Sequence, residues 1–190
     1  MGTTVELSAE THVDMCEGPL MGVSKEDATS SAARVVSPER NRFPFCIVWS
    51  PLPLITWFIP FIGHMGIATS DGIIYDFAGP YTIGREHFAF GAPTRYIQCD
   101  VKADQVEKWD QSVERGCSIY ETRMHNLFCD NCHSHVATCL EHMQYRGIKR
   151  WNMVMLCFWM FFRGKYVDPV GFLKSWIPFV LVVIIIYFAV

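Results

Sequence analysis

The first 40 residues lack an apolar run long enough to serve as a signal peptide. They carry scattered acidic residues among Ser, Thr and Ala, so we expect the N-terminus to stay in the cytosol. Residues 1–41 also lack a hydrophobic period. A segment of this composition cannot bury enough apolar surface to offset its chain entropy, and we predict a disordered arm.

Charge is scarce, and positive charge is not in excess. The net charge is -3, and the basic residues do not alternate with aromatics along one stripe. The sequence therefore predicts no nucleic-acid partner. Hydrophobic residues make up 51% of the chain and charged residues 18%, which favours membrane association over a soluble enzyme.

Nothing in the sequence indicates an oxidising compartment for its eight cysteines. In the reducing cytosol such residues are thiols, metal ligands or a nucleophile, and they do not form a disulfide framework. We expect most of them to be small buried hydrophobic residues.

A long apolar run is present at the C-terminal end. Residues 171–190 give about 30 Å of helix, with Lys174 near the start and no charge after it. We predict that this helix spans a lipid bilayer. Basic residues precede it, with Asp168 as the one opposing charge after Glu141, so the positive-inside tendency places the folded part in the cytosol. Residues 151–162 are apolar but short, and they fit a partner helix, an interfacial helix or a buried core element.

A second apolar stretch lies between residues 45 and 62. Residues 45–49 are predicted to form a buried strand, and residues 54–62 are too short to cross a membrane at about 1.5 Å per helical residue. Together they would reach spanning length, but three prolines interrupt the helix that a span requires. We favour an interfacial or re-entrant element over a true span.

The strands of the sequence lie in residues 42–150. Residues 64–69 and 73–77 alternate around a Ser70-Asp71-Gly72 turn, which predicts a hairpin. Residues 95–101 are a plausible third strand. The predicted fold class is therefore α+β: a small antiparallel sheet packed on a helix, with a C-terminal membrane helix or helical hairpin.

Two soluble helices follow from the apolar spacing. Residues 103–121 are predicted to form a surface helix that Gly116 interrupts. The clearer helix follows Asp130, with Asp130 or Asn131 as its N-cap and Gly147 as its stop. It provides the helix on which the sheet packs.

The hairpin and the start of the second helix predict a thiol site. The register of the turn puts His64 and Asp76 on one face of the hairpin. The same face carries Gly66 and Ala68, which are small enough to let a helix approach and bring Cys132 close.

The three side chains would then have distinct roles. Cys132 at a helix N-terminus gains a lowered thiol pKa and is the candidate nucleophile. His64 is the candidate base and Asp76 the group that orients it. The alternative is structural, with Cys132 in the core, His64 as a satisfied polar residue and Asp76 facing solvent.

A metal site competes for the same segment. Cys129, Cys132, His133 and His135 place four candidate ligands within one helix start. A zinc site normally draws two ligands from each of two elements, and the second pair is missing. On a helix His135 shares a face with Cys132 while His133 does not. We therefore expect neither a metal nor another cofactor.

The order His64, Asp76, Cys132 resembles that of the permuted papain-like thiol enzymes, including the lecithin retinol acyltransferase group. The match is carried by a His and a polar residue on a hairpin, followed by an Asn-Cys helix start. The third residue of that group is commonly His, and the residues after Cys132 differ. The resemblance implies the fold and the nucleophile, as an expectation from analogy.

A more specific resemblance is to the reversion-to-ethylene-sensitivity family. It extends over about residues 42–180. It implies an integral membrane protein of the endoplasmic reticulum and Golgi, in a family whose plant members act on ethylene receptors as membrane-bound regulators. It implies no enzymatic reaction. The segments that carry it are residues 42–49, 62–67, 76–81, 125–127, 129–136, 151–153, 164–167 and 176–179.

Two functions remain open at this point. The first is a regulator or adaptor of other membrane proteins, in which the His/Cys cluster is structural or binds a ligand. The second is a thiol hydrolase or acyltransferase that acts on lipid or lipidated substrates, with backbone N–H groups near Cys132 as the oxyanion hole. Rapid labelling of Cys132 by an electrophile would favour the second.

Overall fold

The computed structural model describes residues 35–126 and 129–189. Most of the predicted disordered arm, residues 1–34, lies outside the described residues. The rest of the arm contains a 3-10 turn, Pro38–Arg40. The backbone of Ser37 pairs with that of Arg42, so the chain already has a defined path before the first strand.

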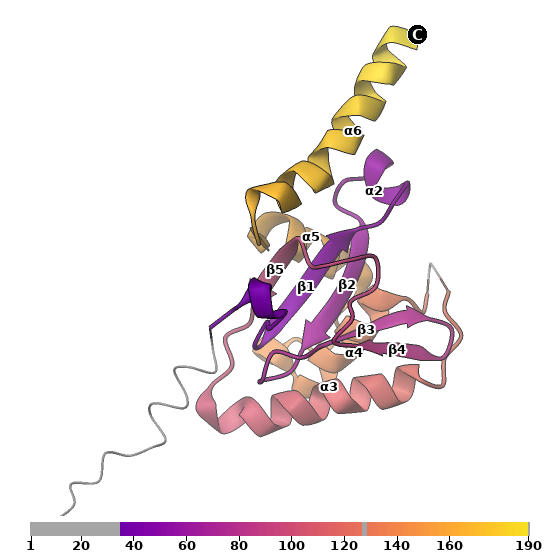
Figure 1. Cartoon of the computed structure of the whole chain (residues 1–190). Helices are drawn as coiled ribbons and strands as arrows, with labels where there is room; N and C mark the ends of the chain where they lie inside the picture. The colour runs from indigo at the N-terminus through magenta and orange to yellow at the C-terminus, as the bar shows by residue number, and fades with distance from the viewer. Residues whose placement is uncertain (1–34, 127–128, 190) are drawn as a thin grey trace, which may run out of the picture.

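Six antiparallel strands form one sheet in the order β4-β3-β2-β1-β5-β6 (Figure 1). This confirms an α+β fold with an antiparallel sheet. The sequence did not indicate β4 or β6, which are the two edge strands. The strands are β1 (Cys46–Pro51), β2 (Gly63–Ala68), β3 (Ile74–Gly79), β4 (Thr82–Arg85), β5 (Arg95–Gln98) and β6 (Lys165–Tyr166).

The β2–β3 hairpin has the predicted register. Gly66 pairs with Asp76, and the turn is closed by the Thr69 N–H, which donates to the Ile73 carbonyl. The pairing of β2 with β3 ends at Gly66 and Asp76. The first residues of β2, including His64, are therefore free of the β3 ladder.

The helices cover the face of β2 opposite to the one we expected. Met65 and Ile67 belong to the same core cluster as Val136 of the second helix, while Ala68 packs in a separate cluster with Phe88. The prediction that small residues would receive the helix is wrong. Met65 and Ile67 offer more apolar area to bury, and that area determines which face a helix covers.

The predicted surface helix is α3 (Val106–Tyr120), preceded by a 3-10 turn, Ala103–Gln105. Gly116 does not interrupt it. A Cβ at Gly116 would overlap the Cys139 sulfur of the neighbouring helix, so glycine here permits close packing of the two helices. Trp109 is buried, and its indole N–H donates to the Ala68 carbonyl at 2.9 Å.

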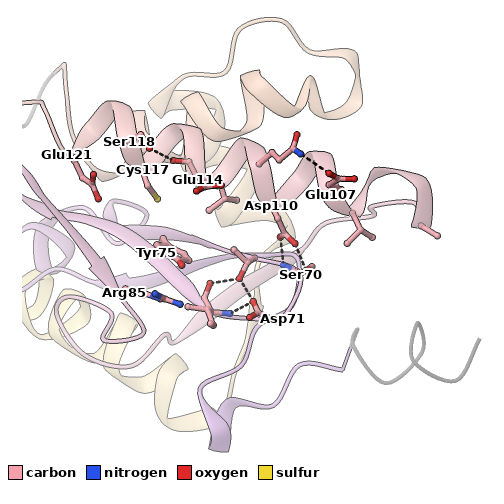
Figure 2. A pocket seen from close by; sticks show the side chains of 16 residues that line it. Ser70, Asp71, Tyr75, Arg85, Glu107, Asp110, Glu114, Cys117, Ser118 and Glu121 are labelled. Carbon is pink, nitrogen blue, oxygen red and sulfur yellow. Dashed lines mark hydrogen bonds between the residues drawn. The ribbon is translucent and has the colours of Figure 1, made fainter. Parts of the chain in front are cut away.

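The N-terminal half of α3 also holds the hairpin turn. The Asp110 carboxylate accepts hydrogen bonds from the Ser70 N–H at 2.7 Å and from the Ser70 hydroxyl at 2.5 Å (Figure 2). Beside this contact lies a groove of about 880 Å³, lined by acidic side chains and by Arg85 (Figure 2). The contact between α3 and the turn fixes the hairpin that carries His64 and Asp76.

The remaining helices are α2 (Ile55–Phe58), α4 (Cys132–Met143), α5 (Met153–Arg163) and α6 (Pro169–Ala189), with a 3-10 turn at Tyr145–Gly147. The second soluble helix, α4, is capped by Asn131 as predicted. Its C-cap is Gln144, which has a left-handed conformation and lies three residues before the expected stop, Gly147.

Among the described residues, α6 is the one helix long and apolar enough to cross a membrane. Only 6% of its most apolar window is buried inside the protein. The segment proposed as an alternative span begins as β1, a buried strand, which rules out a membrane-crossing helix there. The apolar residues 151–162 contribute to the core, because α5 buries Leu156 and Met160.

We expect Gly63→Ala to destabilise the fold. A Cβ at Gly63 would overlap the Trp49 indole and lie 2.5 Å from the Ser50 carbonyl oxygen. This oxygen belongs to the backbone of β1 and cannot move aside without disturbing the strand. Overpacking of this kind lowers the free energy of unfolding by about 1–3 kcal/mol. Thermal unfolding in detergent, followed by circular dichroism, measures it as a fall in Tm of about 2–4 °C per kcal/mol.

Gly79→Ala is the matched control, since a Cβ there meets no atom within 4 Å. Its Tm should stay close to that of the unchanged protein. Equal losses in the two variants would show that the close approach at Gly63 does not limit stability.

Candidate functional site

The centre of the site is a buried histidine–aspartate pair. His64 comes from β2 and Asp76 from β3, and the Nε2 atom of His64 lies 2.6 Å from Oδ2 of Asp76. Their side chains are only 4% and 1% exposed. A histidine held this way presents its other ring nitrogen in a fixed direction, as a general base requires.

Two features hold this pair in place. The rings of Phe88 and Phe90 pack on the His64 ring, with centroids 4.9 and 5.2 Å away. Gly84 of β4 lets the Asp76 carboxylate fit, since a Cβ there would lie 2.5 Å from Oδ1. The edge strand and the loop after it thus form one wall of the site.

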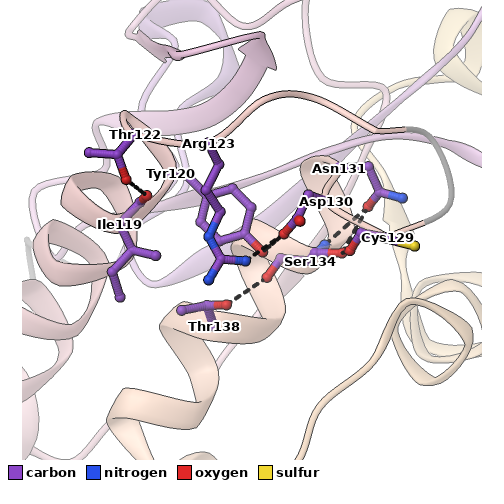
Figure 3. Close-up of polar contacts among 9 residues, drawn as sticks. All are labelled: Ile119, Tyr120, Thr122, Arg123, Cys129, Asp130, Asn131, Ser134 and Thr138. Carbon is purple, nitrogen blue, oxygen red and sulfur yellow. Dashed lines mark hydrogen bonds and ion pairs between the residues drawn. The ribbon is translucent and has the colours of Figure 1, made fainter.

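Cys132 is the first residue of α4. The side-chain oxygen of Asn131 accepts the N–H groups of His133 at 2.9 Å and Ser134 at 3.1 Å, which fixes the start of the helix. The chain before it is held by Asp130, whose carboxylate pairs with Arg123 at 2.5 Å (Figure 3). These contacts position the thiol at the N-terminal end of the helix dipole.

The thiol of Cys132 lies between two imidazoles. The Nδ1 atom of His133 is 3.4 Å from the sulfur, and His64 lies near enough to influence the pKa of the thiol. Burial favours the neutral thiol, but the hydrogen bonds and charges of the two histidines outweigh it and lower the pKa of Cys132 to about 5. The sulfur is therefore a thiolate at neutral pH.

The pKa values of His64 and His133 are raised, whereas that of Cys132 is lowered. Burial disfavours their charged forms, but hydrogen bonds with Asp76 and Cys132 raise the pKa of His64 to about 9. For His133, hydrogen bonds with Cys132 and Cys157 overcome burial and raise the pKa to about 10. The opposite directions of these shifts favour a thiolate on Cys132 beside charged imidazoles on His64 and His133.

Two other buried thiols, Cys99 and Cys117, show the effect of burial without a charged imidazole beside the sulfur. Burial raises the pKa of Cys99 and of Cys117 to about 12, so both are neutral. Of the seven described cysteines six are buried, as expected, and Cys129 is exposed. Burial alone therefore does not account for the acidity of Cys132.

Sequence reasoning assigned two histidines of α4, His133 and His135, to the wrong neighbours. His133 contacts Cys132, whereas His135 lies 3.5 Å from the Cys117 sulfur and 3.7 Å from the Cys139 sulfur. Helical spacing assigns faces but not the direction of a side chain in the first turn, where the His133 ring turns back toward the sulfur. Burial lowers the pKa of His135 to about 3, so it is neutral.

The four residues considered as a metal set do not converge. Cys129 is exposed, Cys132 and His133 contact each other, and His135 faces α3. No group of three or more ligand side chains suited to a metal ion is found in residues 35–126 and 129–189. The arrangement is that of a thiolate with imidazole partners.

The fold and the site define a class of protein: an α+β domain with a buried Cys–His–Asp cluster, followed by an apolar helix able to cross a membrane. The model of the RTE1-like family matches residues 37–108 and 100–164. The chain belongs to this family, as the resemblance implied.

One curated relative is the protein Reversion-to-ethylene sensitivity1 of Arabidopsis thaliana. It is 34% identical over 164 residues, which cover 75% of this chain. The chain matches 66% of the length of that relative. No solved structure matches the chain.

The lowered pKa of Cys132 predicts an acid-shifted reactivity profile. The thiolate should be present above about pH 5 and lost as the pH falls through that value, whereas an unperturbed cysteine changes near pH 8.5. Alkylation by iodoacetamide, followed on the Cys132 peptide by mass spectrometry, should therefore have its midpoint near pH 5. His64→Ala and His133→Ala should each move the midpoint upward.

His142→Ala is the control, because this exposed histidine lies in the last turn of the same helix. It should leave the profile unchanged. A midpoint near pH 8.5 in the unchanged protein would contradict the charge arrangement described above.

Proposed function

We propose that this protein carries out cysteine-dependent acyl hydrolysis or acyl transfer at a membrane. The observation that supports it best is the 2.6 Å His64–Asp76 pair beside the acidic thiol of Cys132. A nucleophile, a base and an orienting group are the three parts of such a site.

The reaction follows from the positions of these groups. The Cys132 thiolate attacks the carbonyl carbon of an ester or thioester, and a carbon–sulfur bond forms. As the bond to the leaving group breaks, His64 gives that group its proton. Water, or the hydroxyl or thiol of an acceptor, then loses a proton to His64 and attacks the acyl-cysteine, which releases the acyl product and restores the thiolate.

The oxyanion of this reaction needs a donor close to the sulfur. The N–H groups of His133 and Ser134 donate to Asn131 and are occupied. Nothing among the described residues accepts the N–H of Cys132 itself. We assign the oxyanion contact to this backbone group, at the positive end of the α4 dipole.

The order of the groups along the chain supports a permuted papain-like arrangement. A hairpin supplies His64 and then Asp76, and a capped helix start supplies Cys132. In this arrangement the helix with the nucleophile follows the strands, and His64 stands between Asp76, which it pairs with, and Cys132, which contributes to its raised pKa. Lipid or lipidated substrates fit an enzyme that is held beside the bilayer by α6.

Trapping of an acyl-enzyme tests this function. Incubation of the full chain in detergent with a p-nitrophenyl acyl ester should add the acyl group to Cys132, detected by mass spectrometry. His64→Ala should slow acylation by about 10²–10⁴-fold, because it removes the imidazole that supports the thiolate and gives the leaving group its proton. Asp76→Asn should slow it less, with His64 still present but poorly held.

Cys129→Ser is the matched control, since this thiol is exposed and outside the cluster. Its acylation rate at Cys132 should equal that of the unchanged protein. The enzymatic proposal would be eliminated if acylation were equally fast at Cys129 and Cys132, or if its rate were unchanged in His64→Ala.

A second candidate function is a regulator or adaptor of other membrane proteins. It is favoured by family membership and by the burial of the thiol, since Cys132 is 5% and His64 3% exposed. In that case the cluster stabilises the domain, and the protein acts by binding.

We further propose that the chain is an animal member of the family, similar to transmembrane protein 222.

For its location we propose the endoplasmic reticulum or Golgi, with the folded domain in the cytosol. The α6 helix and the basic residues before it support this orientation. The protein should remain in the pellet when membranes are washed with alkaline carbonate. An N-terminal tag should be reached by antibody when only the plasma membrane is permeabilised, and a tag hidden under that condition would reverse the orientation.

A further inference from the structure

A large apolar surface remains uncovered next to α6. It combines the loop around α2 with the outer side of α5, and we call it the α2–α5 surface. Each of its members is at least 39% exposed, which is unusual for a contiguous group of such size in a soluble protein. The surface is formed by Leu54, Trp57, Phe58, Phe61, Phe158 and Phe162.

The two parts form one continuous surface. The ring of Phe61 stacks on Phe158 with centroids 6.4 Å apart and planes 11° apart, and it meets Phe161 edge-on at 6.3 Å. Phe158 in turn stacks on Phe162 at 6.2 Å. The loop therefore has a fixed position against α5.

Several backbone groups of the loop are hydrogen-bonded within the loop itself. The Thr56 hydroxyl accepts the Leu52 N–H and donates to the Ile62 carbonyl, both at 2.7 Å, so one buried side chain joins the two ends. Inside, the Ile59 N–H bonds to the Ile55 carbonyl at 2.9 Å. Hydrocarbon offers no hydrogen-bond partners, so a loop immersed in it must supply them itself.

The position of the loop also indicates contact with a membrane. The α2 helix packs along the side of α6, well above the sheet (Figure 1). The chain from residue 43 to residue 63 contains no charged side chain. Exposed cations lie instead between the end of α5 and the first turns of α6, where lipid headgroups would meet them. They are Arg163, Lys165 and Lys174.

We propose that the α2–α5 surface is immersed in the same leaflet that α6 enters, so that the domain is held by lipid on two elements and not by α6 alone. The occupant is lipid hydrocarbon, because the surface is continuous with the membrane helix and its loop carries no charged side chain to offer a protein. This inference holds whether or not Cys132 is catalytic. It also places His64, two residues after the loop, directly below the bilayer surface.

Spin-label accessibility in vesicles tests the proposal. The full chain, with Cys16→Ser, Cys129→Ser and Cys132→Ser to remove competing thiols, is labelled at Phe58→Cys or Phe162→Cys and reconstituted in phosphatidylcholine vesicles at less than one molecule per vesicle. Collisions are measured with oxygen, which concentrates in hydrocarbon, and with a water-soluble nickel complex. Met124→Cys, an equally exposed position in the loop after α3, is the control.

The expected result is a ratio of oxygen to nickel collisions that is several-fold higher at positions 58 and 162 than at 124. Efficient collision with nickel at both positions would show a water-exposed surface and overturn the proposal. Low collision with both reagents would show that protein covers the surface, and this also overturns it. Two independent positions guard against one variant that folds poorly.

Discussion

The structure depends on one constraint, which is that charges taken out of water must find partners. Asp76, His64, Cys132 and His133 are all buried, and an unpaired ion in such a place is strongly unfavourable. Each charge is met by an opposite one, and the glycine at position 84 makes the necessary space. The strands, the helix cap and the edge of the sheet are arranged around this cluster.

Sequence reasoning located the hairpin and the helix start because both have local causes. A Ser-Asp-Gly turn fixes the register around it, and an Asn before an apolar stripe caps a helix. The short edge strands β4 and β6 have no such signal, since four and two residues cannot show a period. Their pairing depends on residues distant in sequence.

The three residues predicted as a site lie near one another in the fold, whereas part of their surroundings differs from the prediction. Periodicity shows which residues share a face, but the covering element is chosen by the apolar area available, and here α4 packs on Met65 and Ile67. His133 was judged to point away from the sulfur, yet its ring turns back to within 3.4 Å. Rotamers in the first turn of a helix are decided by tertiary contacts that one sequence does not reveal.

Helix α5 links the two halves of the molecule through adjacent residues. Phe158 lies on the outer side of the helix, while Cys157 is buried and contributes to the raised pKa of His133. A rotation or sliding of α5 in response to lipid packing would move the partner of His133, and with it the balance of protons on the sulfur. The outer contact of α5 and its inner contact thus come from adjacent residues, so a displacement of this helix reaches both the exposed apolar side and the surroundings of the thiol.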